Sequence, residues 1–341
     1  MANAATVRSE GARSWRGAPL AVLRRLGAVL ALLAMCAILT VLSDHFLTFD
    51  NLMNVFRQSA VNTLLALGQL LVIVTAGIDL SVGSILGFAC VVAALMLKAG
   101  APAWLSILAA IAVGTALGSV NGLLLTRLRL PHPFIPTLGM MNVARGLALV
   151  ISGGFPISGL PDGFRWLGAG KIFYVPAPVF VVLVVCVLLH LFLNRTAVGR
   201  DIYAIGGNKQ AAVLCGIPVN SRLTLVYAIS GALAGLAAVL LAGRMNSGYP
   251  LAGSGAELDS IAAVIIGGAS FFGGVGTVSG TLVGALMIGV LRNGLNLLDV
   301  SSYWQSAVIG VVIVMAVWID VMRQRAASKH AMEKSKTSEL K

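Results

Sequence analysis

Five charged or titratable side chains lie within or beside the long apolar runs of this sequence, where chemistry inside a membrane would need them. Asp79 lies at a glycine-flanked turn between two runs, and Glu257 and Asp259 open another, where a carboxylate suits a helix N-terminus. Arg145 and His190 lie near the ends of two further runs. Buried carboxylates and histidines are the groups that relay protons in membranes. All except Asp79 are also explained as helix caps or interface residues, so a proton relay is weakly supported.

The sequence lacks the usual groups that hold a nucleotide phosphate or a metal. The phosphate-binding motif G-x-x-x-x-G-K-[ST] is absent, and residues 267–276, which come nearest, are rich in glycine but are followed by no lysine. A tight turn between packed spans explains this segment. The four cysteines and four histidines are scattered and show no metal-ligand spacing. We therefore expect no metal, no bound cofactor and no bond chemistry in this chain.

The composition is that of an integral membrane protein. The 341 residues are 58% hydrophobic and 11% charged, whereas a soluble domain is about 45–50% apolar and about 25% charged. Long continuous apolar runs favour helices over a barrel. The net charge of +12 arises mostly between and beyond these runs, as the positive-inside rule expects, so nucleic acid is not needed as a partner.

About ten spans follow from the length of roughly 20 apolar residues that crosses a bilayer. Residues 1–25 are expected to form a cytoplasmic N-terminal segment, residues 26–322 the transmembrane domain, and residues 323–341 a cytoplasmic tail that ends irregularly. Most Lys and Arg residues then lie on the side of the two termini, which places both in the cytoplasm. The predicted spans are 26–43, 60–77, 80–97, 103–125, 134–151, 177–194, 222–242, 258–272, 276–297 and 303–321.

Two glycine ladders predict close helix packing. They fall on the fourth and ninth spans, and each starts with Gly-Thr and continues into an apolar run. Glycines four residues apart share one helix face and let two backbones approach. The ladders are five spans apart, an odd number, which predicts an inverted repeat of five spans plus five, whereas one missed or extra span would make the repeat parallel. The ladder residues are Gly114, Gly118, Gly122, Gly276, Gly280 and Gly284.

The longest predicted cytoplasmic loop, residues 195–221, is expected to contain a short helix from Asn208 to Leu214. Asn208 is suited to cap its start and Gly216 its end, and Pro218 blocks continuation. Such a helix suits docking to a motor subunit, but a linker helix lying on the membrane surface explains the spacing equally well.

This loop, G-R-D-I-Y-A-I-G-G-N-K-Q-A-A-V-L-C-G-I, resembles the coupling loop of the ribose-type permeases of bacterial ATP-binding cassette importers. Residues 77–83 (G-I-D-L-S-V-G), 133–139 (P-F-I-P-T-L-G) and 257–268 (E-L-D-S-I-A-A-V-I-I-G-G) are similar to further motifs of that family. Pro136 and His132 depart from the usual residues. The likeness covers nearly the whole chain.

The resemblance implies an all-α polytopic permease of the bacterial cytoplasmic membrane that works by alternating access. Its expected partners are lipid, a second permease chain, a cytoplasmic subunit that uses the ATP, and an extracytoplasmic sugar-binding protein. The substrate class is a monosaccharide or related small polyol, and the particular sugar is left open. The residues expected to couple to the ATPase are Gly199, Ala204, Gly207, Asn208, Ala211, Ala212 and Gly216.

Polar residues beside apolar runs are the candidates for the translocation path. We expect them to face a wet cavity or one another, because an unpartnered buried polar group costs about 1–3 kcal/mol. Arg145, Glu257 and Asp259 are expected on the outer side, where Arg145 and Glu257 either pair or meet the binding protein. Leu97 is expected to contact lipid or a loop. An ion-coupled carrier or a passive facilitator are the alternatives. The candidate path residues are Asp79, Ser81, Asn121, Phe134, Thr137 and Asn142.

Overall fold

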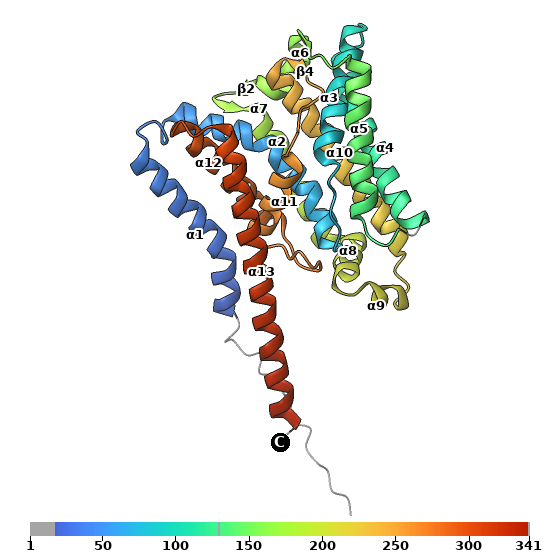
Figure 1. Cartoon of the computed structure of the whole chain (residues 1–341), viewed down its shortest axis with the longest axis vertical. Helices are drawn as coiled ribbons and strands as arrows, with labels where there is room; N and C mark the ends of the chain where they lie inside the picture. Colours follow the sequence, from blue (N-terminus) through green and yellow to red (C-terminus); the bar gives the residue numbers. More distant parts are fainter. Residues whose placement is uncertain (1–17, 129, 340–341) are drawn as a thin grey trace, which may run out of the picture.

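The computed structural model describes residues 18–128 and 130–339, and the side chains of 27–128 and 130–322. Within that part the chain is helical, with two short antiparallel strand pairs, β1 with β4 and β2 with β3 (Figure 1). Most of the predicted N-terminal segment lies outside the described residues. The elements are α1 (Ala18–Leu42), α2 (Phe49–Val74), α3 (Val82–Lys98), α4 (Ala103–Arg127), α5 (Phe134–Ser152), β1 (Ile157–Ser158), α6 (Asp162–Ala169), β2 (Lys171–Ile172), β3 (Val175–Pro176), α7 (Ala177–Arg195), α8 (Ala197–Gly207), α9 (Lys209–Leu214), α10 (Val219–Met245), β4 (Ser247–Gly248), α11 (Ala256–Ile266), α12 (Val278–Leu297) and α13 (Ser302–Glu339).

The predicted all-α polytopic membrane fold is confirmed. In the described part, α2, α4, α5, α7, α10, α12 and the first 21 residues of α13 are long and apolar enough to cross a membrane, and residues 27–42 and 82–98 form shorter apolar helices. Helix α11 has only 11 residues, about 16 Å at 1.5 Å per residue. It reaches about halfway through a hydrocarbon core of roughly 30 Å. The count of ten spans stays a prediction.

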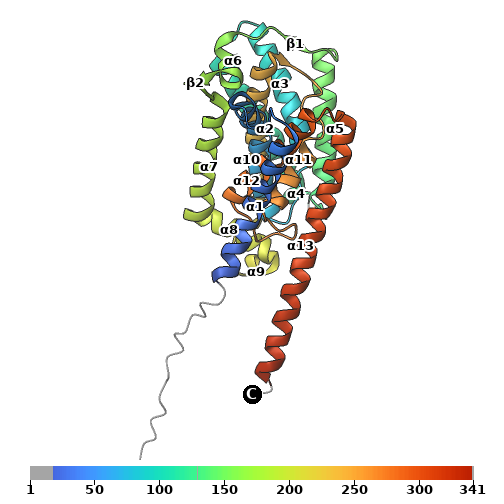
Figure 2. The ribbon, with the colours of Figure 1, turned by 90° about the vertical axis from the view of Figure 1, so that its left-hand side faces the viewer.

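Helices α2 and α10 form the centre of the molecule. Their most apolar stretches are 78% and 72% buried, against 22% for α4 and 11% for α13. In Figure 2, α7 and α13 flank this central group on opposite sides. The peripheral helices expose rows of large apolar side chains, as surfaces that face lipid or another chain must.

The first glycine ladder packs α4 directly onto α10. The contacts on α10 run backwards as α4 runs forwards, so the two helices are antiparallel. Because Gly231 on α10 is itself a glycine, the two backbones touch there without side chains between them. The groups that a Cβ would overlap are the backbone of Gly231 for Gly114, the carbonyl of Tyr227 for Gly118, and the backbone of Thr224 for Gly122.

The second ladder packs α12 onto the half-length helix α11, but with two glycines instead of three. A Cβ on Gly280 would overlap the carbonyl oxygen of Gly267, and one on Gly284 that of Ala263. Gly276 precedes α12, and a Cβ there would meet the side chains of Leu70 and Val74 on α2 at 2.7 and 2.9 Å. The prediction that Gly276 belongs to a helix–helix ladder is therefore wrong.

Two further expectations need correction. Leu97 is only 7% exposed and belongs to the main hydrophobic core, because the end of α3 is covered by neighbouring elements. The C-terminal tail, expected to end irregularly, continues α13 as a helix to Glu339 and extends beyond the rest of the molecule (Figure 1).

Candidate functional site

A buried polar cluster forms around the turn between α2 and α3. The carboxylate of Asp79 accepts hydrogen bonds from the backbone N–H of Ser81 at 2.9 Å, from the Ser81 hydroxyl at 2.6 Å and from the Ser230 hydroxyl on α10 at 3.2 Å. The three side chains are at most 1% exposed. Hydrogen bonds from neutral groups thus compensate this carboxylate, and none of the described cations lies within 4 Å of it.

The cluster extends to three more helices. Asn121 on α4 donates to the Ser81 hydroxyl at 2.8 Å, and Thr137 on α5 donates to the carbonyl of Ile78 at 3.4 Å and to that of Pro133 at 3.1 Å. With its amide oriented to satisfy both groups, Gln69 on α2 bridges the backbone N–H and C=O of Asp79. The sequence pattern predicted Asp79, Ser81, Asn121 and Thr137 as candidates. It did not predict Gln69 and Ser230, although each is a polar residue within an apolar run.

These candidate path residues therefore face one another in this conformation. Of the two arrangements expected for them, a shared wet cavity or mutual contact, the structure shows mutual contact. The cluster joins α2, α4, α5 and α10 at the α2–α3 turn. A movement of that turn would therefore strain or break hydrogen bonds to all four helices.

Ser81→Ala is expected to lower the free energy of unfolding by about 1–3 kcal/mol, because Asp79 loses a donor and Asn121 loses its acceptor in a dry site. Thermal unfolding of the purified protein in detergent measures this. Ser59→Ala is the matched control, since the Ser59 hydroxyl is also buried but has no partner. Equal losses in the two variants would mean that the cluster contributes no more than any buried serine.

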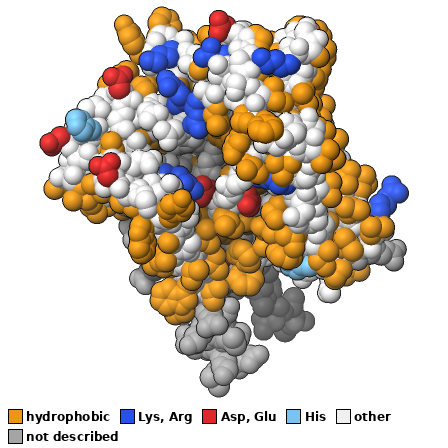
Figure 3. Space-filling model, turned by 45° about the horizontal axis from the view of Figure 1, so that its top comes forward, with side chains coloured by type: hydrophobic (Ala, Val, Ile, Leu, Met, Phe, Trp, Pro, Cys, Tyr) orange, Lys and Arg blue, Asp and Glu red, His pale blue; other side chains and the backbone are white. Residues whose placement is uncertain are grey.

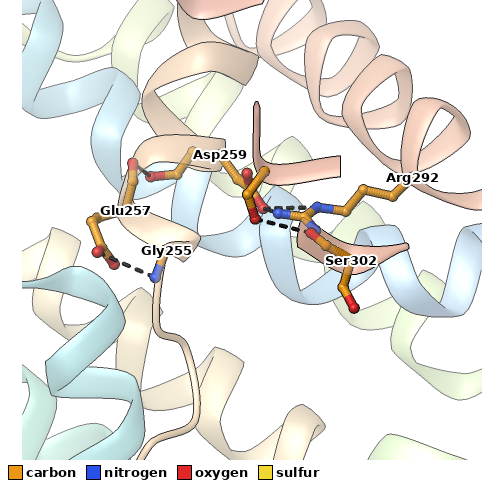
Figure 4. A network of polar contacts seen from close by, with 7 residues as sticks. Gly255, Glu257, Asp259, Arg292 and Ser302 are labelled. Carbon is orange, nitrogen blue, oxygen red and sulfur yellow. Dashed lines mark hydrogen bonds and ion pairs between the residues drawn. The ribbon is translucent and has the colours of Figure 1, made fainter. Parts of the chain in front are cut away.

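Charged groups at the start of α11, beside the first turn of α3, divide into an ion pair and a carboxylate with no cation within 4 Å among the described residues (Figure 4). Asp259 on α11 accepts from Arg292 on α12 at 2.7 and 3.1 Å. Glu257 accepts from the N–H of Gly255 at 3.2 Å, and its second oxygen is buried without a partner.

Arg145 does not form an ion pair with Glu257 within 4 Å. Its guanidinium donates to the carbonyls of Pro250 and Ala252 at 2.8 and 3.0 Å. Because both carbonyls lie in the loop before α11, Arg145 ties α5 to that loop. Arg292 could not be recognised from the sequence as the partner of Asp259, because the two residues are 33 positions apart.

Two other candidates lie on the outside of the helix bundle. Phe134 is 43% exposed, and Asn142 is exposed with its amide nitrogen bonded to the carbonyl of Leu138 at 3.1 Å. Gly139 and Gly146 lie on the same exposed side of α5, with no other atom near them. A polar side chain on an otherwise apolar exposed face calls for water or a polar neighbour within the membrane.

The short helix expected after Asn208 is present as α9. The Asn208 side chain accepts from the N–H of Ala211 at 3.0 Å, and Gly216 has a φ of 78° at the end of the helix. Helix α8 precedes it and is capped by Thr196, whose hydroxyl accepts from Gly199 at 3.0 Å.

The residues expected to contact an ATPase divide by exposure. Gly199 and Ala212 are buried, so they hold the loop's own structure, while the others are exposed. The prominent apolar groups of this surface are Val213 and Leu214, at 56% and 89% exposure. Their position in a predicted cytoplasmic loop could have identified them. The exposed members of the predicted set are Ala204, Gly207, Asn208, Ala211 and Gly216.

Helix α8 is connected by backbone contacts to the end of α2. A Cβ on Gly206 would overlap the carbonyl oxygen of Val74, and Gly274 donates its N–H to the same oxygen at 2.9 Å. Tyr203 donates its hydroxyl to the carbonyl of Gly276 at 2.7 Å, and burial raises the pKa of Tyr203, which keeps it protonated as a donor. The glycine-rich segment 267–276 thus joins α8 to the turn that carries Asp79.

A helical membrane bundle with a buried polar centre and an exposed capped helix at one end is an architecture that suits a membrane transport subunit. Among the described residues no cluster of three metal-ligating side chains occurs. Residues 51–317 match the family described as the permease component of the branched-chain amino acid transport system. The chain belongs to this permease family, and the ribose-type resemblance is confirmed.

Its relatives include three sugar permeases. The ribose import permease RbsC of Escherichia coli K12 is 44% identical over 300 residues, covering 87% of this chain and 93% of RbsC. The D-allose permease AlsC of the same strain is 42% identical, covering 81% and 85%. The galactose/methyl galactoside permease MglC is 36% identical, covering 89% and 96%. No solved structure matches the chain.

Proposed function

We propose that this chain is the permease subunit of an ATP-binding cassette importer for a monosaccharide or related polyol. The observation that carries the proposal is the capped helix α9, which presents exposed Val213 and Leu214 at one end of the bundle and connects through α8 to the α2–α3 turn. The names of the relatives supply the substrate class. A partner subunit would use the ATP, and the chain itself needs no cofactor.

In the proposed mechanism, closure of the ATPase pushes α8 and α9. Gly206 transmits the push to Val74 at the end of α2, since no side chain separates the two backbones. The turn with Asp79 then moves relative to α4 and α10, to which its hydrogen bonds attach it. Glycine contacts between α4 and α10 allow these helices to slide.

The proposed location is the bacterial cytoplasmic membrane, with α8, α9 and both termini in the cytoplasm. The positive-inside distribution of Lys and Arg supports this orientation. The end that carries α6 and the loop before α11 is then outside. Several Lys and Arg side chains nevertheless gather on that face, around a hollow (Figure 3).

Basic groups on the outer face would meet acidic groups of an extracytoplasmic binding protein. Arg57 and Arg244 are half-buried near one another. Their guanidinium groups form no hydrogen bond or ion pair with any described residue. A carboxylate fits a guanidinium fork. We therefore place Arg57 and Arg244 in this interface beside Arg145, Glu257 and Asp259.

The proposed sugar path follows the exposed face of α5 and is completed by a second copy of the chain. Asn142 and Phe134 lie on this face, whereas Asp79, Ser81, Asn121 and Thr137 are buried within one subunit. A second copy would cover the apolar part of the face, and Asn142 would contact the sugar or water between the copies.

The inverted repeat is proposed on the pairing of helices. With α1 to α5 as one half and α7, α10, α11, α12 and α13 as the other, four contacts have counterparts: α4–α10 with α12–α2, α3–α4 with α11–α12, α3–α10 with α11–α2, and α3–α5 with α11–α13. The ladders themselves do not face equivalent helices, since one meets α10 and the other α11. Helix pairing, not the ladder, is therefore what supports the repeat.

Reconstitution tests the function. Proteoliposomes with the permease, its ATPase subunit and the cognate binding protein are expected to take up labelled sugar only with ATP and all three proteins. Uptake by the permease alone, abolished by an uncoupler, would instead identify an ion-coupled carrier.

Asn142→Cys is expected to react with a charged, water-soluble methanethiosulfonate at least about tenfold faster than Val184→Cys. Both positions are exposed on the single chain, but Val184 lies on α7, where lipid excludes a charged reagent. Rates are measured in membranes after the exposed Cys215 is replaced by serine. Thr137→Cys, fully buried here, is expected to react only during turnover. Equal protection of Asn142 and Val184 would exclude a wet path along α5.

A further inference from the structure

The chain between β4 and α11 runs into the helix bundle without forming a helix. This inserted segment, residues 249–255, follows α3 from the end that carries β4. Close backbone contacts record its course. A Cβ on Gly248 would meet the carbonyl oxygen of Cys90 at 2.7 Å, and one on Gly83 would overlap the carbonyl oxygen of Gly253. The segment therefore extends beside α3 as far as the first turn of that helix.

The depth that the inserted segment reaches follows from the length of α3. Gly83 lies 15 residues before Lys98, the last residue of α3, which corresponds to a rise of about 22 Å. The hydrocarbon core of a bilayer is roughly 30 Å thick. Figure 1 likewise shows α11 between the level of β4 and the level of α8. The segment thus brings irregular backbone to the middle of the membrane.

Part of this backbone is uncovered in the single chain. Leu251 is 42% exposed, Ser254 is exposed, and Leu258 in the first turn of α11 is 50% exposed. The backbone N–H groups of Leu251 and Gly253 have no hydrogen-bond partner among the described residues. Irregular backbone at membrane depth is tolerated only where protein buries it or water reaches it. This side of the molecule therefore faces water or another chain, not lipid.

The inserted segment adjoins the α5 face that we propose as the sugar path. Arg145 on α5 donates to the carbonyls of Pro250 and Ala252 in the segment, and Asn142 lies three residues before Arg145 on the same helix. The exposed faces of α1, α7 and α13 consist of regular helix, whose backbone groups are paired internally. Among the exposed sides, the one shared by α5 and the segment is thus the side that needs water.

The polar groups of the segment favour water over a dry contact with a second copy. The Ser254 hydroxyl donates to the carbonyl of Leu251 at 2.9 Å, and its oxygen can still accept from a ligand or water. A dry contact would have to supply an acceptor for each free N–H, since buried polar groups are nearly always paired. Water and the hydroxyls of a sugar supply such acceptors at every position.

We propose that the inserted segment is the second wall of the sugar path and that Ser254 contacts the sugar in the middle of the membrane. The proposal rests on the proposed function, which supplies the path and its solute. Because Gly83 and Gly253 meet without side chains between them, displacement of the α2–α3 turn, which leads into α3, moves this wall. The segment thus joins the coupling helices to the path that they open.

Access of water is the first test. Ser254→Cys is expected to react with a charged methanethiosulfonate at least about tenfold faster than Val187→Cys, because lipid excludes a charged reagent. Val187 is the matched control, since it is 58% exposed and lies near the middle of α7. Rates are measured in membranes after Cys215 is replaced by serine. Equal protection of the two cysteines would overturn the inference, because Ser254 would then face lipid or a dry interface.

Obstruction of the path is the second test. Ser254→Trp is expected to lower ATP-dependent sugar uptake about tenfold or more, while thermal stability and copurification with the ATPase stay unchanged, because the added ring extends from an exposed position. Val187→Trp, on the lipid side, should transport within about twofold of the wild type. Wild-type uptake by Ser254→Trp would overturn the inference. Uptake by the wild-type protein in the same proteoliposomes, with and without ATP and binding protein, tests the proposed function separately, so the two failures are distinguishable.

Discussion

Gly118→Leu is expected to abolish transport and to prevent recovery of folded protein. A single added Cβ on Gly118 would already overlap the carbonyl oxygen of Tyr227, and three further carbons must be accommodated between α4 and α10. Overpacking of ordinary cores costs about 1–3 kcal/mol. Here the opposing atoms belong to backbone, which cannot rotate away, so we expect at least about 3 kcal/mol. Size-exclusion chromatography in detergent and uptake in proteoliposomes measure the two losses.

The matched control is Gly27→Leu on the peripheral helix α1. Nothing lies within 4 Å of a Cβ at Gly27, and the residue is exposed. The change of residue is the same, but we expect normal recovery and transport. Leu97→Ala is no suitable control, since Leu97 is buried in the core. If Gly118→Leu folds and transports like Gly27→Leu, α4 and α10 are not in backbone contact in the working protein.

Leu214→Asp is expected to weaken binding of the ATPase subunit about tenfold or more without affecting the fold. Leu214 is 89% exposed on α9, so the single chain loses no contact when it is replaced. Burial of a leucine at an interface contributes roughly 1.5–3 kcal/mol, and a buried unpaired carboxylate adds a further cost. Copurification with the ATPase, and hydrolysis stimulated by the loaded binding protein, should both decline while thermal stability stays unchanged.

Gln210→Ala tests whether the effect depends on the apolar end of α9. Gln210 is exposed on the same short helix, and we expect less than a twofold change in ATPase affinity. If Leu214→Asp binds the ATPase with wild-type affinity while α9 loses its contact with lipid, the competing interpretation of α9 as a linker helix on the membrane surface is supported.

Local features were predictable because their causes are local. Each of the ten predicted apolar ranges overlaps one helix, since apolar length is a property of neighbouring residues. The Asn208 cap and the Gly216 terminator of α9 were predicted because capping depends on residues three or four positions apart. Family motifs similarly pointed to the permease family that the comparisons show.

Contacts between distant segments were decided only by the tertiary structure. The glycine spacing predicted close approach but could not name the partner, because the Gly231 that meets Gly114 lies 117 residues further along the chain. The same reason hid Arg292 as the partner of Asp259 and Ser230 as a donor to Asp79. The sequence by itself determined where the ten apolar helices lie and to which family the chain belongs, whereas α6, α8 and the helical continuation of α13 were not predicted. Packing decided which polar residues are sealed in a cluster and which, like Asn142, stay on an outer face, because burial depends on every neighbouring helix at once.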